Sequence, residues 1–135
     1  AQYEEVLGWV CDHLDGPMEL RATCAPHLAR VAEARGVDLG HHRGCLAGMS
    51  VVFVSHRGEV FPCGYLPTHC GSVRESSLAE IWRTSDQLAA VAGRENLTGA
   101  CAACSVKANC GGCRARALGA TGDLWAPDPA CIRCR

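Results

Sequence analysis

The first part of the chain combines two helical patterns with one short extended pattern. Apolar side chains recur at helical spacing near the N-terminus and stop at Gly16-Pro17; they are Tyr3, Val6, Leu7, Val10 and Leu14. A second helix is predicted within residues 25–36, because Pro26 suits a first turn and Gly36 a C-terminal cap. Residues 18–23 between them are short enough for a strand. A lone buried strand needs neighbours for its backbone groups, so we expect this unit to be the C-terminal end of something longer.

The second part of the chain predicts a hairpin and then a helix. Residues 49–63 have the pattern of two short strands around a turn, in which Gly58 can take the positive φ that the turn needs. A helix is predicted from Ser77, which forms a capping box with Glu80, to Gly93. Its apolar face consists of Leu78, Ile81, Trp82, Leu88 and Val91. After this helix we find no long periodic segment up to residue 135.

Composition limits the kinds of partner and the kind of core. The 135 residues carry 13 basic and 14 acidic side chains, which gives no electrostatic reason to expect a nucleic-acid or anionic-membrane partner. Apolar residues reach 48%, but 11 residues are cysteines and only 5% are aromatic. The apolar core is therefore expected to be thin, and something besides packing has to stabilise the fold.

The cellular location of the protein decides whether disulfides or bound metal supply this additional stability. The sequence contains no secretory signal and no apolar run near 18 residues, so we expect neither secretion nor membrane insertion. A cytoplasmic location favours reduced thiols and metal. The chain begins with Ala rather than Met, so a missing N-terminal portion could hide a signal. Eleven is also an odd number, which a closed disulfide framework would not use.

Four cysteines crowd into a short stretch near the C-terminus, namely Cys101, Cys104, Cys110 and Cys113. A zinc ribbon separates its two Cys-x-x-Cys pairs by roughly 15 to 20 residues, whereas the gap between Cys104 and Cys110 is five residues. Five residues can close a zinc site, but zinc would leave several thiols unused. Iron–sulfur clusters accept thiolates crowded along a loop together with a distant one. Gly111 and Gly112 would let the backbone send Cys113 to a second cluster.

The order of the cysteines resembles the SPASM auxiliary domain of radical S-adenosylmethionine (SAM) enzymes. Gly58 and then Cys63 follow Cys45, the crowded thiols come next, and Cys131 comes last. The departure from the family pattern is that two residues, not three, separate Cys110 from Cys113. The segments "TCAPH", "SLAEIWRTS" and "CGGCRARALGATGD" are most similar to the haem-biosynthesis branch, which makes haem d1 and haem b by an alternative route.

This resemblance implies the fold class and the ligands. The expected fold is α+β, with residues 1–39 as the C-terminal helix–strand–helix of a partial (β/α) radical SAM barrel and residues 40–135 as the SPASM domain. One [4Fe–4S] cluster would be bound by Cys101, Cys104, Cys110 and Cys131. Cys113 would cross to a second cluster at Cys45 and Cys63, where Cys24 is the candidate fourth ligand unless one iron stays open. Some members assemble only one auxiliary cluster.

The resemblance also implies a function. The domain would transfer electrons and form part of the substrate wall in an enzyme that removes a carboxyl group or side chain from a tetrapyrrole propionate. SAM and its own [4Fe–4S] cluster would belong to a radical SAM core upstream in the same longer chain, because no Cys-x-x-x-Cys-x-x-Cys run occurs here. The chain alone is therefore not expected to be active, and a reductant protein is a further possible partner. A peptide-modifying radical SAM enzyme and a structural zinc module remain the alternatives.

Three further cysteines and several polar residues have less specific interpretations. Cys11 is expected to be a small buried hydrophobe, whereas Cys70 and Cys134 have no assigned role, and Cys134 could replace Cys131. Two interpretations are open for His41, His42 and Arg43: they lie in an exposed loop, or they contact a substrate carboxylate. Two interpretations are also open for Arg114 and Arg116: they bind propionates, or they pair with Asp123 or Asp128. Trp9 and Trp82 are expected in the core, and residues 121–123 in a turn.

Overall fold

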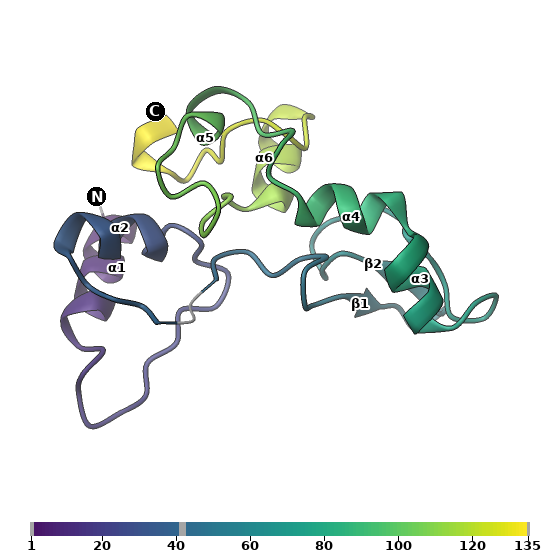
Figure 1. Cartoon of the computed structure of the whole chain (residues 1–135), viewed down its shortest axis with the longest axis horizontal. Helices are drawn as coiled ribbons and strands as arrows, with labels where there is room; N and C mark the ends of the chain where they lie inside the picture. Colours follow the sequence, from purple (N-terminus) through teal and green to yellow (C-terminus); the bar gives the residue numbers. More distant parts are fainter. Residues whose placement is uncertain (1, 41–42, 135) are drawn as a thin grey trace.

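The computed structural model describes residues 2–40 and 43–134 and arranges them in three groups of elements (Figure 1). A pair of N-terminal helices lies at one end, and a small sheet with two helices lies at the other. The C-terminal part lies between these two groups along one side of the molecule. In the described ranges, no helix is both long and apolar enough to cross a bilayer.

The N-terminal group consists of α1 (Gln2–Asp12) and α2 (Leu28–Arg35), as the apolar spacing predicts. Their facing sides form one apolar cluster, made of Leu7, Cys11, Leu28, Val31 and Ala32. The predicted cap of the second helix is confirmed, because Gly36 has φ +66° and its N–H donates to the last carbonyls of α2. Ion pairs of Arg30 with Glu4 and of Arg35 with Asp12 join the two helices.

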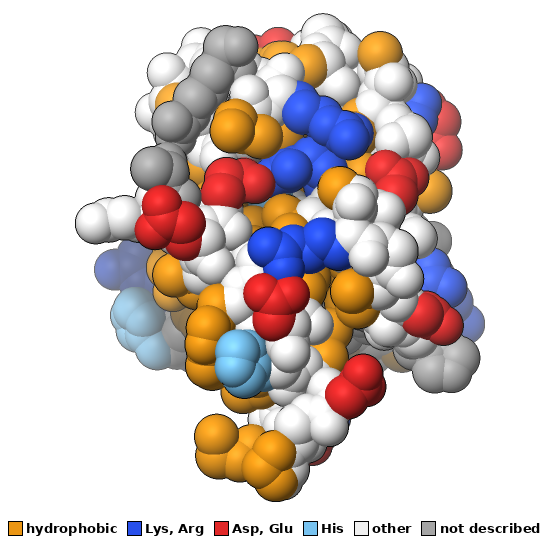
Figure 2. Space-filling view, turned by 90° about the vertical axis from the view of Figure 1, so that its left-hand side faces the viewer, with side chains coloured by type: hydrophobic (Ala, Val, Ile, Leu, Met, Phe, Trp, Pro, Cys, Tyr) orange, Lys and Arg blue, Asp and Glu red, His pale blue; other side chains and the backbone are white. Residues whose placement is uncertain are grey.

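Two predictions about this region are wrong. Residues 18–23 form no strand but an irregular and mostly exposed connection, because no neighbouring strand in the described chain supplies backbone partners. Trp9 is 51% exposed and stacks on His13 instead of packing in the core. The reason is that α1 packs against α2 through Leu7 and Cys11, and Trp9 is not part of that cluster. Figure 2 shows this end of the molecule, where apolar side chains are exposed among charged ones.

The predicted hairpin is confirmed, and a third strand extends it. β1 (Phe53–Val54) pairs antiparallel with β2 (Glu59–Phe61), and β2 pairs antiparallel with β3 (Gly71–Ser72). Gly58 has φ +86° in the turn between the first two strands. No sequence pattern indicated β3, because two small residues show no alternation of apolar and polar side chains.

The helix predicted from Ser77 to Gly93 is two helices, α3 (Leu78–Thr84) and α4 (Asp86–Ala92). Ser77 caps α3 as predicted, because its hydroxyl accepts the Glu80 N–H at 3.2 Å. Ser85 breaks the run, since its hydroxyl accepts the Leu88 N–H and so caps α4. The apolar face is kept across the break, with Ile81, Leu88 and Val91 buried, Trp82 half-buried and Leu78 exposed.

The tail, defined as residues 95–134, has only short elements: α5 (Gly99–Ala102), α6 (Arg114–Thr121) and the 3-10 turn η1 (Ile132–Cys134). The turn expected at residues 121–123 is confirmed, since Gly122 ends α6 with φ +75° and the Thr121 hydroxyl accepts the Asp123 N–H. The buried apolar residues form four small clusters rather than one large core. The expectation of a thin apolar core is thus confirmed.

Candidate metal centre

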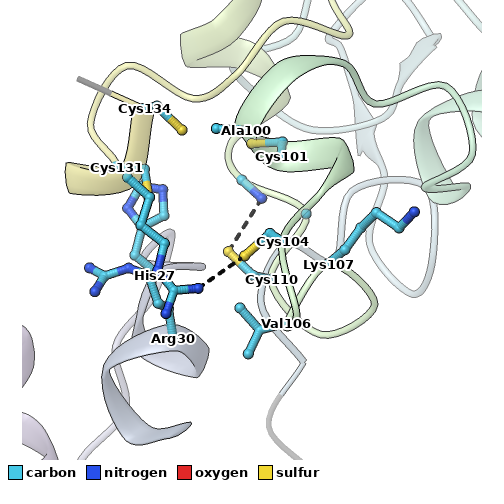
Figure 3. Close-up of a pocket in the computed structure, with 13 residues that line it drawn as sticks. His27, Arg30, Ala100, Cys101, Cys104, Val106, Lys107, Cys110, Cys131 and Cys134 are labelled. Atoms are coloured by element: carbon cyan, nitrogen blue, oxygen red, sulfur yellow. Dashed lines mark hydrogen bonds between the residues drawn. The ribbon is translucent and has the colours of Figure 1, made fainter. Parts of the chain in front are cut away.

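Five cysteines line one pocket in the tail, which we call the tail pocket (Figure 3). They are Cys101, Cys104, Cys110, Cys131 and Cys134. The first three come from α5 and the loop after it, and the last two come from the C-terminal turn on the facing side. His27 and Arg30 of the α2 region close the pocket from below in this view. The pocket therefore joins residues that are more than 70 positions apart in the sequence.

Short backbone turns place the first three thiols. The Cys104 N–H donates to the Cys101 carbonyl at 3.4 Å, and the Cys110 N–H donates to the Val106 carbonyl at 2.8 Å. Gly111 and Gly112 then follow with φ +63° each, a conformation that glycine adopts at little cost. This reversal lets the Gly112 N–H point back at the Cys110 sulfur, at 3.5 Å. The reversal also separates Cys110 from Cys113, which the sequence analysis predicts to bind different clusters.

Two thiols of the tail pocket, Cys110 and Cys134, have raised pKa values. Burial, followed by the neighbouring thiols of Cys131, Cys104 and Cys101, raises the pKa of Cys110 to about 11 against the opposing Gly112 N–H. Burial also raises the pKa of Cys134, followed by the charges of Cys101 and Cys131. Thiolates are the metal-binding form, so a cation has to displace these protons. Arg133 contributes one positive contact, from its Nη1 to the Cys104 sulfur at 3.5 Å.

Three other cysteines gather beside the hairpin, and we call Cys45, Cys63 and Cys113 the hairpin site. Cys45 and Cys63 pack against the same apolar cluster, which includes Leu66 and Val91. Cys113 precedes the first turn of α6, and α6 also packs on this cluster through Leu118. Burial raises the pKa of the Cys45 thiol; the Ala47 N–H opposes this, and Cys113 and Cys63 raise it further. These three thiols are therefore neighbours in the fold.

The remaining cysteines line neither the tail pocket nor the apolar cluster at the hairpin site. Cys24 is exposed with φ +56°, and its carbonyl accepts a hydrogen bond from Arg116 at 3.5 Å. Cys11 is buried in the α1–α2 cluster, as expected. Cys70 is buried near the sheet, where its thiol donates to the Thr68 carbonyl at 3.3 Å.

Asp128 connects the two groups of thiols. Its side chain is fully buried and accepts the Cys113 N–H at 2.6 Å and the Ala130 N–H at 3.0 Å. Arg116 donates to both of its carboxylate oxygens, and His27 Nε2 lies 3.1 Å away. Burial alone would raise the pKa of this carboxyl, but the close contact with His27 and the hydrogen bonds from Arg116 and the backbone keep it well below its usual range. The charged carboxylate of Asp128 thus holds the backbone of Cys113. Asp128 itself lies three residues before Cys131, which lines the tail pocket.

Arg94 forms a second connection that sequence reasoning missed. Its guanidinium donates to the Cys45 carbonyl at 3.0 Å and to the Val91 carbonyl at 3.3 Å. The same side chain lies against Gly111, where an added Cβ would be 2.3 Å from Arg94 Nε. Burial lowers the pKa of Arg94, and the charges of Cys45 and Cys110 act in the opposite direction. Arg94 therefore lies between the hairpin site and the tail pocket, and nothing in its local sequence marks it.

The two arginines of α6 have different partners in the structure. Arg116 pairs with Asp128, as one alternative predicted. Arg114 is 1% exposed and donates to the carbonyls of Leu124 and Ala126 at 2.8 Å each, so it has a structural role. Arg43 is exposed. The other two loop candidates, His41 and His42, lie outside the described residues.

The residues present fit an iron–sulfur group by the chemistry of their donors. The tail pocket and the hairpin site each gather thiols from distant parts of the chain, and clusters of this kind are bound by cysteine thiolates. Across residues 2–40 and 43–134, no three His, Cys, Asp or Glu side chains are grouped so that they could hold a single metal ion.

Comparison with protein families gives one match within the chain. Residues 45–105 match the family model SPASM, described as an iron-sulfur cluster-binding domain. The matched range contains Cys45, Cys63, Cys101 and Cys104 and ends before Gly111 and Gly112. The range thus includes members of both the hairpin site and the tail pocket.

Curated relatives are similar over most of this chain. An AdoMet-dependent heme synthase from Nitratidesulfovibrio vulgaris is 42% identical over 97% of this chain and 39% of its own length. A pre-heme d1 synthase from Dinoroseobacter shibae is 38% identical over 78% of this chain and 25% of its own. A PqqA peptide cyclase from Rhizobium meliloti is 36% identical over 67% of this chain and 26% of its own. The chain thus spans about two fifths of the heme synthase and about a quarter of the other two.

Proposed function

Because the chain carries a SPASM iron–sulfur cluster-binding domain, we propose that it is the auxiliary-cluster part of a radical SAM enzyme that acts on a tetrapyrrole. The observation that carries this proposal is the gathering of five thiols in the tail pocket and three in the hairpin site. These eight cysteines are spread from residue 45 to residue 134. A fold that only needed packing would not bring so many thiols together in two places.

The proposed assembly contains two [4Fe–4S] clusters. The tail cluster has Cys101, Cys104, Cys110 and Cys131 as ligands. The hairpin cluster has Cys45, Cys63 and Cys113, with Cys24 as its fourth ligand or an open iron in that place. Residues 1–39 form the end of the radical SAM barrel and residues 40–135 the SPASM domain. The chain contains no Cys-x-x-x-Cys-x-x-Cys run, so SAM cleavage belongs to a core elsewhere in the same longer polypeptide.

When bound, thiolate-ligated clusters supply electron acceptors whose potential depends on the hydrogen bonds and burial around them. This suits a reaction in which a hydrogen atom and a carboxyl group leave a propionate and one electron has to be removed. Two side chains of this chain hold the cluster-binding cysteines in place for this reaction. Asp128 fixes the backbone of Cys113, and Arg94 fixes the backbone of Cys45. Both contacts are part-buried, at 2.6 Å for Cys113 and 3.0 Å for Cys45, and they hold the backbone of two hairpin-site cysteines.

Turnover by the full-length protein tests the substrate class. We expect the anaerobically purified protein, supplied with SAM, a reductant and a tetrapyrrole bearing propionates, to release carbon dioxide and 5′-deoxyadenosine. Mass spectrometry of the tetrapyrrole measures the loss of the carboxyl group. A protein with Cys63→Ala is the matched control, because it keeps the tail pocket intact. Deoxyadenosine formation without any change in the tetrapyrrole would contradict the proposed substrate class.

A peptide substrate is the second candidate, favoured by the similarity to the PqqA peptide cyclase. That similarity covers less of this chain at lower identity than the similarity to the heme synthase. Cross-linking of a precursor peptide in the same assay, with no change in the tetrapyrrole, would support this candidate. The colour of the purified protein distinguishes a structural zinc role from an iron–sulfur role, because an iron–sulfur protein is brown with broad absorption near roughly 400 nm. A colourless protein that contains zinc would overturn both redox functions.

A further inference from the structure

The tail pocket contains one thiol more than a cluster uses. A [4Fe–4S] cluster is held by four cysteine thiolates, whereas five cysteines line this pocket. Three of them come from residues 101–110, and each is placed by its own local turn. The last ligand has to come from the C-terminal turn, which offers both Cys131 and Cys134. The fourth position of the cluster therefore has two candidate ligands.

The geometry of η1 presents these two thiols on the same side of the chain. Residues three apart in a 3-10 helix are eclipsed, because the helix has three residues per turn. Cys131 and Cys134 are three apart, and the Cys134 N–H donates to the Cys131 carbonyl at 3.0 Å. Figure 3 shows both side chains on the side of the pocket that faces Cys101 and Cys104. A small rotation of the turn would exchange one thiol for the other without moving the rest of the tail.

The surroundings rank the two thiols. Cys131 is 7% exposed, and it lines the pocket together with Arg30. Cys134 is only half-buried and lies at the end of the turn, nearer to solvent. Arg133, between the two, contacts the Cys104 sulfur at 3.5 Å and so keeps the turn against the pocket. Cys131 is thus the resident ligand and Cys134 the neighbour that can replace it.

We propose that Cys134 is an exchangeable fifth ligand of the tail cluster, which takes the iron corner of Cys131 whenever Cys131 is absent or released. This inference rests on the proposed function, since it needs a cluster in the tail pocket. In the exchange, the bond from iron to the Cys131 sulfur breaks and a bond from the same iron to the Cys134 sulfur forms. The proton of the Cys134 thiol passes to Cys131, and no electron is transferred. The cluster thereby keeps four thiolates through the exchange.

The test compares the reconstituted full-length protein with three variants: Cys131→Ala, Cys134→Ala and the double variant. Iron and sulfide content and electron paramagnetic resonance (EPR) of the reduced protein are measured. We expect Cys134→Ala to keep both clusters with unchanged spectra. Cys131→Ala should keep both clusters with a shifted spectrum for the tail cluster. The double variant should lose the tail cluster and keep the hairpin cluster, which reports that the protein is folded.

Alkylation of the loaded protein, followed by mass spectrometry, gives a second readout. In the unmodified protein Cys134 should react and Cys131 should be protected, whereas in Cys131→Ala Cys134 should become protected. Cys70→Ala is the control for loss of a buried thiol away from the pocket, and Cys104→Ala is the control for loss of a ligand without a replacement.

Loss of the tail cluster in Cys131→Ala alone, with Cys134 still reactive, would overturn the exchange while the proposed function stands. Retention of the tail cluster in the double variant would overturn it as well. Failure of the unmodified protein to bind iron and sulfide would overturn the proposed function together with this inference.

Discussion

The α1–α2 pair and the tail are stabilised in different ways. The helix pair buries Leu7, Leu28 and Val31 between two amphipathic helices, and its buried charge Arg30 has a direct partner in Glu4. The tail has no helix longer than eight residues in its described part, and its largest fully buried side chain is Arg114. Its interior combines thiols and a hydrogen-bonded carboxylate with small apolar residues such as Val106 and Ala117. The first region follows from apolar periodicity, whereas we propose that the second depends on polar contacts and bound metal.

Removal of iron should give the largest difference between the two regions. Metal binding supplies folding free energy to domains that lack a sufficient apolar core. We expect chelation under reducing conditions to bring amide exchange in the tail close to that of an unfolded chain, while α3 and the α1–α2 pair keep their protection. Hydrogen exchange with mass spectrometry measures this region by region. Unchanged protection of the tail after iron removal would show that its polar contacts suffice.

Loss of the Asp128 charge should have the next largest effect. Removal of one partner from a buried ion pair costs about 3 kcal/mol or more, and Asp128→Asn leaves Arg116 and His27 without their carboxylate. Asp123→Asn is the matched control, because Asp123 is exposed and an amide oxygen can still accept the Trp125 N–H. We expect the control to change the free energy of unfolding by less than about 0.5 kcal/mol. Urea unfolding of the loaded proteins measures both values, and equal effects would contradict a central role for Asp128.

A smaller effect is expected at the glycine turn. Gly112 has φ +63°, and a Cβ there would lie 2.6 Å from Arg114 Nη2 and 2.9 Å from the Asp128 Cβ. Gly112→Ala should therefore destabilise the loaded protein by about 2 kcal/mol, since the left-handed conformation alone costs an L-residue about 1–2 kcal/mol. Gly119→Ala is the control, because it lies in α6 with nothing within 4 Å of the added Cβ. This control should stabilise the protein by about 0.5–1 kcal/mol. Thermal unfolding that shows the same sign for both variants would contradict the strained turn.

Local signals account for what the sequence predicted correctly. Gly36 and Gly58 mark a cap and a turn through their own backbone conformation, and Ser77 caps a helix within four residues. Features that depend on distant partners were missed or wrong. The strand expected at residues 18–23 fails because its neighbours are absent from the described chain, and β3 exists only because β2 lies beside it.

The site shows the same division. The family resemblance implied two groups of thiols, and the assignment of each cysteine to a cluster stays a prediction. The full set of contacts of Asp128 was not predictable, because His27 comes from a distant segment, whereas Cys113 and Arg116 lie together at the start of α6. Arg94 was missed for the same reason, since it donates to a carbonyl 49 positions away.

A comparison of variants at Cys110 and Cys113 tests the central claim most directly. The claim is that these two cysteines, three residues apart, serve different clusters because the glycines between them reverse the chain. Iron and sulfide content together with EPR spectra of Cys110→Ala and Cys113→Ala decide it, with Cys104→Ala and Cys63→Ala as references. We predict that Cys110→Ala loses the same signal as Cys104→Ala, and that Cys113→Ala loses the same signal as Cys63→Ala. Loss of one common signal in Cys110→Ala and Cys113→Ala, with that signal intact in Cys63→Ala, would contradict the account.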